Sequence, residues 1–150
     1  MEADSYQIGG SYYKTEYEHW SLVIACGLSY FEGNTTKYIT RWRKKGGATD
    51  LRKSLHYLNK MEETVTSSPK RLLTTAEILR EVNAFCEANN LKDLERAYVR
   101  ALCTWQIKEE LDGARQFLFL LLDEAEALDK GATPAPLSDS NKHADRYGGA

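Results

Sequence analysis

Cysteine is scarce in this chain of 150 residues. The three cysteines, Cys26, Cys86 and Cys103, are an odd number, and none lies in a CxxC motif or at a Cys/His spacing typical of a metal site. All three stand among apolar residues, which is typical of reduced thiols in the core of a cytosolic protein. We therefore expect neither a disulfide framework nor a zinc site.

Long apolar runs are also missing. The run FLFLLL at residues 117–122 is far shorter than the roughly 20 residues of a membrane-spanning helix. The first residues, MEADSYQIGG, have no basic start and no apolar segment, so they do not resemble a signal peptide. We therefore expect no membrane segment and a cytoplasmic location.

The short motifs of common enzyme classes are absent from the sequence. It contains no GxxxxGK[ST] phosphate loop, no GxGxxG and no HExxH. The three histidines, His19, His56 and His143, are isolated from one another, so we expect no metal ligand among them. No Ser/His/Asp or Cys/His arrangement for nucleophilic catalysis is visible either.

Helical periodicity, by contrast, runs through most of the chain. Apolar residues recur every three to four positions between Gly pairs, an Asn pair and the linker TSSP, which predicts an all-α fold, a compact bundle of about five to six helices. The expected helices span about residues 18–27, 31–45, 50–65, 75–87, 91–105 and 110–129. Thr49 or Asp50 should cap the third helix, and Thr74 or Thr75 the fourth. Residues 1–11 are polar with a Gly pair and should form a flexible arm, and the tail from residue 131, which contains Pro and Gly, should be disordered.

Positive charge is concentrated in one segment of an acidic protein. The whole chain has a formal charge of −2, but residues 34–60 hold eight Lys or Arg against the single acid Asp50, a local charge of +7. With this overall charge the protein has no general attraction for nucleic acid. The segment therefore suggests a local site for an anion; a solvated basic helix face paired with the acidic segments is the alternative.

The basic residues fall on helical stripes. One stripe has members at offsets 0, 3, 4, 7 and 11: Asn34, Lys37, Tyr38, Arg41 and Lys45. The next helix offers a second stripe at offsets 0, 3, 7 and 10: Asp50, Lys53, Tyr57 and Lys60. A helix hairpin that turns at Gly46-Gly47 would bring both stripes to a common pocket, while Arg43 and Lys44 lie off the first stripe.

Such a pocket suits a nucleotide. Lys supplies a point charge to phosphate, and the planar fork of Arg binds two phosphate oxygens. Tyr can stack on a base, and Asn can hydrogen-bond a base edge or a ribose hydroxyl. Phosphoryl transfer depends mainly on positioning and on stabilising spread negative charge. The candidate catalytic residues are therefore Lys37, Arg41 and Lys53, with Lys45 among the binding residues.

Three stretches of the sequence resemble a small phage family. They are YYK at residues 12–14, FEGNTTKYITRWRKKGG from Phe31 and DLRKSLHYL from Asp50. In order and spacing they are similar to the HYK, F-x-x-GN-x-x-KY-x-x-R and DL-x-KA-x-x-YL pattern of a domain-of-unknown-function family typified by the nucleotide kinase of phage T7. The resemblance covers residues 12–63, with Tyr12 in place of the family's His and Ser54 in place of its Ala.

The resemblance implies a nucleoside monophosphate kinase of the dTMP/dGMP type, with ATP as phosphate donor, in the cytoplasm of a phage-infected host. It implies as binding residues Tyr13, Lys14, Asn34, Lys37, Tyr38, Arg41, Asp50, Lys53 and Tyr57. It gives no metal ligand set. The chain divides accordingly into a nucleotide-kinase-like helical domain at residues 1–66, a helical C-terminal region at 67–130 and a disordered tail at 131–150.

Two other functions fit the same sequence. One is a non-enzymatic nucleotide-binding module that sequesters a signalling nucleotide of host defence, and the other is a module that binds a host protein through its C-terminal half. Turnover of ATP separates the kinase from both. We also expect a homo-oligomer, because the helix around residues 117–122 is apolar on most of its circumference and needs extensive cover.

Overall fold

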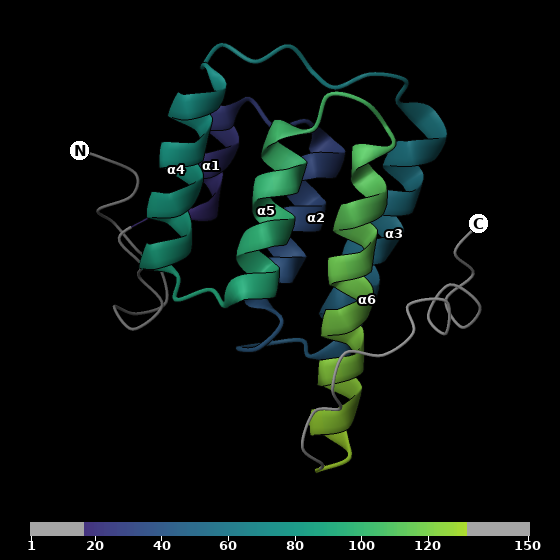
Figure 1. Ribbon diagram of the computed structural model, residues 1–150. Helices are drawn as coiled ribbons and strands as arrows, with labels where there is room; N and C mark the ends of the chain where they lie inside the picture. The colour runs from purple at the N-terminus through teal and green to yellow at the C-terminus, as the bar shows by residue number, and fades with distance from the viewer. Residues whose placement is uncertain (1–16, 132–150) are drawn as a thin grey trace.

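The computed structural model describes residues 17–131. Within this range the chain forms six α-helices and no strand (Figure 1), which confirms the predicted all-α fold. The helices are α1 (His19–Cys26), α2 (Tyr30–Arg41), α3 (Ala48–Thr64), α4 (Thr75–Ala88), α5 (Asp93–Thr104) and α6 (Glu110–Asp129). The predicted arm and tail lie outside the described residues apart from Gly131, as do the candidate binding residues Tyr13 and Lys14.

The six helices pack as two layers of three (Figure 1). The first layer contains α1, α2 and α3, and each of them packs on its counterpart in the second layer: α1 on α4, α2 on α5 and α3 on α6. Residues 65–74 cross one end of the molecule and connect the layers. The boundary drawn between residues 66 and 67 therefore falls on this connection, although the buried apolar residues of both layers form one shared core.

Glycine and capping boxes set several helix boundaries. α1 ends at Gly27, whose φ of 63° is left-handed and favours glycine at this position. α2 and α4 each begin with a capping box, in which Ser29 pairs with Glu32 and Thr74 with Glu77. The predicted cap at Thr74 is confirmed.

The turn between α2 and α3 differs from the prediction. α2 ends at Arg41 and does not continue to Lys45, and the N-cap of α3 is Gly47 and neither of the two predicted residues. The carboxylate of Asp50 points back into the turn and accepts a hydrogen bond from the backbone N–H of Gly46 at 3.0 Å. A Cβ on Gly46 would lie 2.2 Å from Cγ of Asp50, so this close approach requires glycine. It is a tertiary contact, which helical periodicity does not reveal.

The core consists largely of the residues that the periodicity predicts. Fully or nearly fully buried apolar residues include Ile39, Trp42, Leu51, Leu55, Leu58, Met61, Ile78, Val82, Phe85, Tyr98, Val99 and Leu102. Cys26, Cys86 and Cys103 are at most 1% exposed and none forms a disulfide, which confirms the expected core thiols.

Most of the apolar run of α6 is covered within a single chain, with Phe117 and Leu120 half-buried. Leu118, Phe119, Leu121 and Leu122 are at most 1% exposed, because α3 and α5 pack against this helix. A second subunit is therefore not required to cover the apolar run of α6. The homo-oligomer stays a prediction that this run no longer supports. Among residues 17–131 no helix combines the length and apolar character that spanning a membrane requires.

Polar contacts fasten α2 to the second layer. Near the start of α2, the buried carboxylate of Glu32 binds the guanidinium of Arg71 at 2.7 Å and accepts a hydrogen bond from the indole N–H of Trp105 at 2.6 Å. Further along, the hydroxyls of Thr35 and Tyr98 are hydrogen-bonded at 2.6 Å. Each contact pairs polar groups that would otherwise be buried without partners. A shift of one layer along the other would break these pairs, so they fix how the two layers align.

A third polar contact lies near the end of α2. The buried carboxylate of Glu95 on α5 accepts hydrogen bonds from the indole of Trp42 at 3.1 Å and from Arg43 at 2.9 Å. Arg43 also pairs with Glu124 of α6. Arg43, off the predicted stripe, is thus held by acidic residues of the second layer and serves the fold.

Candidate functional site

Three cationic side chains of α2 and α3 surround one tyrosine ring. The centroid of the Tyr38 ring lies 4.8 Å from Nζ of Lys37, 4.9 Å from Cζ of Arg41 and 5.3 Å from Nζ of Lys53. All three distances lie within the roughly 6 Å range of a cation–π contact. The helix hairpin thus brings together the three residues predicted to be catalytic, two from α2 and one from α3.

Two more tyrosines extend this cluster. The rings of Tyr57 and Tyr38 are stacked, with centroids 5.9 Å apart and an interplanar angle of 9°, and Tyr30 meets Tyr57 edge-on at 6.0 Å. Hydrogen bonding with Tyr30 raises the pKa of Tyr57, so its hydroxyl keeps its proton at neutral pH. The stacked rings fill the space between the two predicted stripes.

An open hollow lies beside the stacked rings instead of the deep pocket that facing stripes would give. Its volume is about 350 Å³. Its lining residues are Tyr38, Thr49, Arg52, Lys53, His56 and Tyr57. We call it the α2–α3 hollow. It offers positive charge, aromatic surface and one imidazole.

The charges around the Tyr38 ring are only partly neutralised. Arg41 forms an ion pair with Asp50 at 3.0 Å, and Asp50 is 1% exposed. Asp50 therefore holds the Arg41 side chain and the turn, and its place among residues that contact a ligand stays a prediction. Lys37 and Lys53 have no carboxylate within 4.0 Å among the described residues. An anion would therefore meet two uncompensated ammonium groups.

A second hollow lies on the other side of α2, where α1 packs beside it. Its volume is about 270 Å³. Its lining residues are His19, Val23, Leu28, Ser29, Tyr30, Gly33, Asn34 and Lys37. We call it the α1–α2 hollow. Burial and the nearby charge of Lys37 lower the pKa of His19 to about 4, so the imidazole is neutral at pH 7. The sequence offered no signal for His19, because only the packing of α1 brings it to Lys37.

Other predicted site residues lie apart from the Tyr38 ring. Lys45 is exposed in the turn after α2 has ended, so it is not on the helical stripe. Lys60 pairs with Glu63 at 3.4 Å near the end of α3. Asn34 lies on α2 as predicted and lines the α1–α2 hollow.

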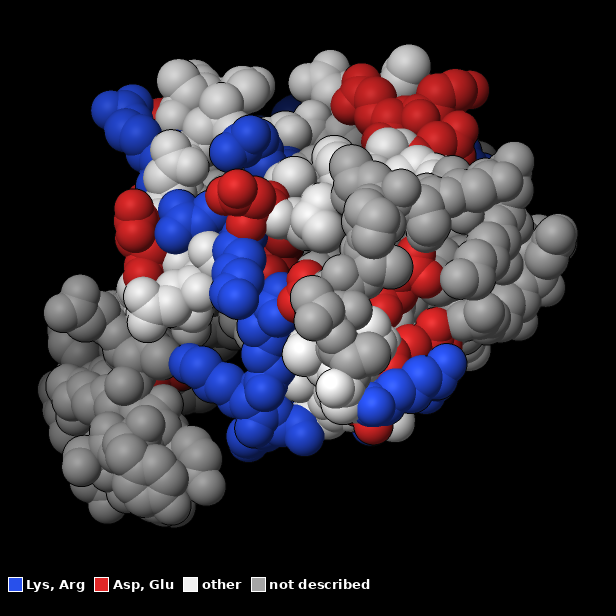
Figure 2. Space-filling view, turned by 60° about the horizontal axis from the view of Figure 1, so that its bottom comes forward, with Lys and Arg blue, Asp and Glu red and all other residues white. Residues whose placement is uncertain are grey.

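Positive charge also gathers at the end of the molecule where α2 and α3 are joined. Figure 2 looks onto this end and shows Lys and Arg side chains in a band with acidic side chains beside it. The turn itself carries Lys44 and Lys45, both exposed. An anionic ligand that approaches from this side meets a positive field before it reaches α2, which favours its association.

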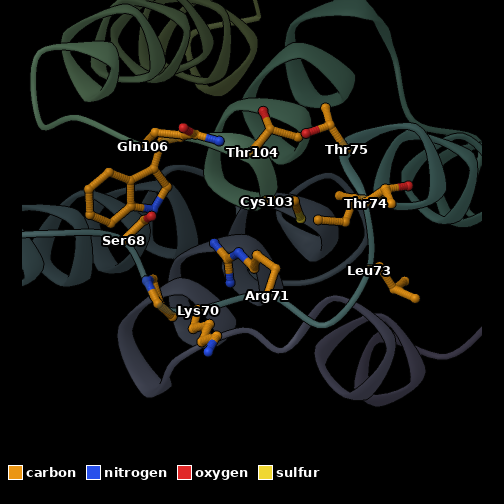
Figure 3. A pocket seen from close by; sticks show the side chains of 12 residues that line it. Ser68, Lys70, Arg71, Leu73, Thr74, Thr75, Cys103, Thr104 and Gln106 are labelled. Atoms are coloured by element: carbon orange, nitrogen blue, oxygen red, sulfur yellow. The ribbon is translucent and has the colours of Figure 1, made fainter.

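A larger hollow, of about 440 Å³, lies at the connection between the layers (Figure 3). Its lining includes two cations, the exposed Lys70 and Arg71, and the guanidinium of Arg71 is occupied. It donates to Glu32 at 2.7 and 3.0 Å and to the backbone carbonyls of Gly27 at 2.9 Å and Leu102 at 3.3 Å. A guanidinium with these partners serves the fold, so this hollow is a weaker candidate than the Tyr38 cluster.

No candidate metal centre is found in the described part of the chain, where no three His, Cys, Asp or Glu side chains are grouped to hold an ion. Protein-family models, curated protein sequences and solved structures yield no match to this chain. The resemblance to the phage kinase family therefore stays a prediction, and the function is inferred below from the cationic side chains around the Tyr38 ring.

Proposed function

We propose that the outer surface of α2 and α3 binds the phosphates of a nucleotide. The observation that carries this proposal is the convergence of Lys37, Arg41 and Lys53 on the Tyr38 ring. Lys37 and Lys53 supply point charges to phosphate oxygens. Arg41 uses two of its N–H groups on Asp50 and has others for a ligand, since a guanidinium carries five N–H donors.

We further propose phosphoryl transfer as the leading activity, with a nucleoside monophosphate of the dTMP/dGMP type as acceptor and ATP as donor. In this reaction an acceptor phosphate oxygen attacks the γ-phosphorus of ATP, the bond to the β–γ bridging oxygen breaks, and ADP leaves with that electron pair. Negative charge spreads over the transferred group, and the three cations would stabilise it. A divalent ion needed for this step would arrive on the ATP phosphates, as Mg²⁺ commonly does.

A second candidate is binding without turnover, as in a module that sequesters a nucleotide. One observation favours it. Asp50, the sole acid of the two stripes, is buried and occupied by Arg41 and the Gly46 amide. It is therefore not free to orient an acceptor or a metal ion. Measurement of ADP release from ATP and dGMP in the presence of Mg²⁺ separates the two candidates.

Binding is tested by calorimetry with ATP, dGMP and dTMP on the Lys37→Ala and Lys53→Ala variants. Each variant should bind at least about tenfold more weakly, because a hydrogen bond to a charged group contributes about 1.5–3 kcal/mol. Lys44→Ala is the control, since Lys44 is exposed in the turn. Arg41→Ala is a poor test because it leaves the buried carboxylate of Asp50 without its ion pair. Equal losses in all three lysine variants would show a diffuse field and contradict a defined site.

A further inference from the structure

We propose that the α1–α2 hollow is the base subsite of the nucleotide site and that it favours bases with an exocyclic amino group over thymine and uracil. This inference depends on the proposed nucleotide binding, and within the proposed dTMP/dGMP class it makes dGMP the preferred acceptor. It assigns the hollow to the base, Asn34 and His19 to base selection, and the α2–α3 hollow to the phosphates.

The two hollows share a wall. Lys37 lines the α1–α2 hollow, and its ammonium lies 4.8 Å from the centroid of the Tyr38 ring, which lines the α2–α3 hollow. Tyr30 lines the first hollow and contacts Tyr57 of the second at 6.0 Å. A ligand that extends across Lys37 would therefore occupy both hollows.

The sizes of the hollows suit a shared ligand. Ligand pockets usually measure about 300–1,000 Å³, whereas the α1–α2 hollow has about 270 Å³ and its neighbour about 350 Å³. The smaller hollow is thus sized for part of a ligand. Val23 and Leu28 give it apolar surface, while Lys53, which has no carboxylate partner in the described part of the chain, lies in the other hollow. The base therefore fits the first hollow and the phosphates the second.

The side-chain amide of Asn34 has a fixed orientation. Its Nδ2 donates to the backbone carbonyl oxygen of Tyr30, one turn earlier in α2, at 2.9 Å. A carbonyl oxygen only accepts hydrogen bonds, so the atom that faces it must be the nitrogen. The Oδ1 atom of Asn34 is then an acceptor on a residue that lines the hollow.

The hydrogen bonds around His19 fix its tautomer. Its Nε2 lies 2.9 Å from Oγ1 of Thr36, and that hydroxyl donates its own hydrogen to the backbone oxygen of Glu32 at 2.8 Å. The Thr36 oxygen must therefore accept from His19, which places the proton of the neutral ring on Nε2. The lone pair of Nδ1 is then an acceptor on a second residue that lines the hollow.

Two acceptors select a base that presents donors. Adenine, cytosine and guanine carry an amino group, and guanine adds an adjacent ring N–H. Thymine and uracil present one ring N–H between two carbonyl oxygens. The N–H can donate to one of the two acceptors, and the other acceptor would face a carbonyl oxygen that has no hydrogen to donate. A site built for a donor rejects an analogue that leaves its polar groups unpaired.

The test compares dGMP with dTMP, which share sugar and phosphate, by calorimetry on the full chain. Wild-type protein should bind dGMP several-fold more tightly than dTMP, since a neutral hydrogen bond contributes about 0.5–1.5 kcal/mol and thymine can supply at most one of the two. Asn34→Ala should weaken dGMP binding several-fold and leave dTMP binding nearly unchanged. Asn83→Ala, an exposed amide on α4, is the matched control and should change neither.

Equal affinity of wild-type protein for dGMP and dTMP would overturn the base subsite, as would an Asn34→Ala variant that weakens both by the same factor. If both nucleotides bind equally and Lys53→Ala still weakens them, the phosphate site stands and only the base subsite fails. If neither nucleotide binds, both proposals fail. Circular dichroism of Asn34→Ala should show unchanged helix content, because Asn34 lies at the surface of α2 and outside the core.

Discussion

Replacement of Arg71 by alanine removes the guanidinium that joins three helices at the connection between the layers. Arg71 donates to the carbonyls at the ends of α1 and α5 and forms two hydrogen bonds with Glu32. Glu32 is fully buried. Without Arg71, the carboxylate of Glu32 keeps the Trp105 indole and the Ser29 amide as its partners among the described residues.

The expected loss of unfolding free energy follows from the burial of Glu32. Breaking a buried ion pair from one side costs about 3–5 kcal/mol, because an uncompensated charge stays inside the protein. Domains of this size have a free energy of unfolding of about 5–15 kcal/mol. The Arg71→Ala variant should therefore lose about a fifth or more of its stability, and Tm should fall by roughly 10 °C.

Chemical denaturation and thermal melting measure this loss. Lys70→Ala is the control, because Lys70 is the exposed neighbour of Arg71 and its removal should change stability by at most about 0.5 kcal/mol. Trp105→Phe, which removes one hydrogen bond to Glu32, should give an intermediate loss of about 1.5–3 kcal/mol. An Arg71→Ala variant as stable as Lys70→Ala would refute the structural role of this joint.

Three more predictions concern stability. Folding lowers the pKa of His19 from 6.5 to about 4, so the imidazole binds a proton more tightly in the unfolded chain. The free energy of unfolding should therefore fall as the pH falls from 6.5 to 4, by up to about 1.4 kcal/mol per pH unit. Denaturant titrations at pH 7 and 5 should show this loss in wild type and a smaller one in His19→Gln. Tyr98→Phe should cost about 0.5–1.5 kcal/mol by removing the hydrogen bond to Thr35, as the same titrations at pH 7 would show. Leu118→Asp should unfold the chain, since Leu118 is fully buried and a buried carboxylate costs several kcal/mol; a folded Leu118→Asp monomer in light scattering would contradict this.

Local signals in the sequence predicted much of the fold. The 3.6-residue spacing of Leu51, Leu55 and Leu58 marked the buried face of α3, and Gly27 and Thr74 marked helix ends. These features depend on residues close together in the chain, so periodicity and capping rules detect them. Helix number and type are therefore readable without the structure.

Long-range contacts were not predictable in this way. Asp50 turns inward to Gly46 and Arg41, and His19 reaches Lys37 only because α1 packs beside α2. The cover of α6 by α3 and α5 likewise arises from tertiary packing. The convergence of Lys37, Arg41 and Lys53 was expected from their stripes. The tyrosine stack that occupies the space between the stripes was not, because ring geometry across two helices has no signature in spacing.

The most direct test of the account locates the bound nucleotide on the molecule. The 150-residue chain labelled with ¹⁵N, of 17.1 kDa, would be titrated with dGMP and followed by two-dimensional NMR. The account predicts saturable shifts of backbone amide signals at residues 33–41 and 53–57, with α4 signals unchanged. Shifts confined to the Arg71 hollow, or no saturable shifts at low salt, would contradict it.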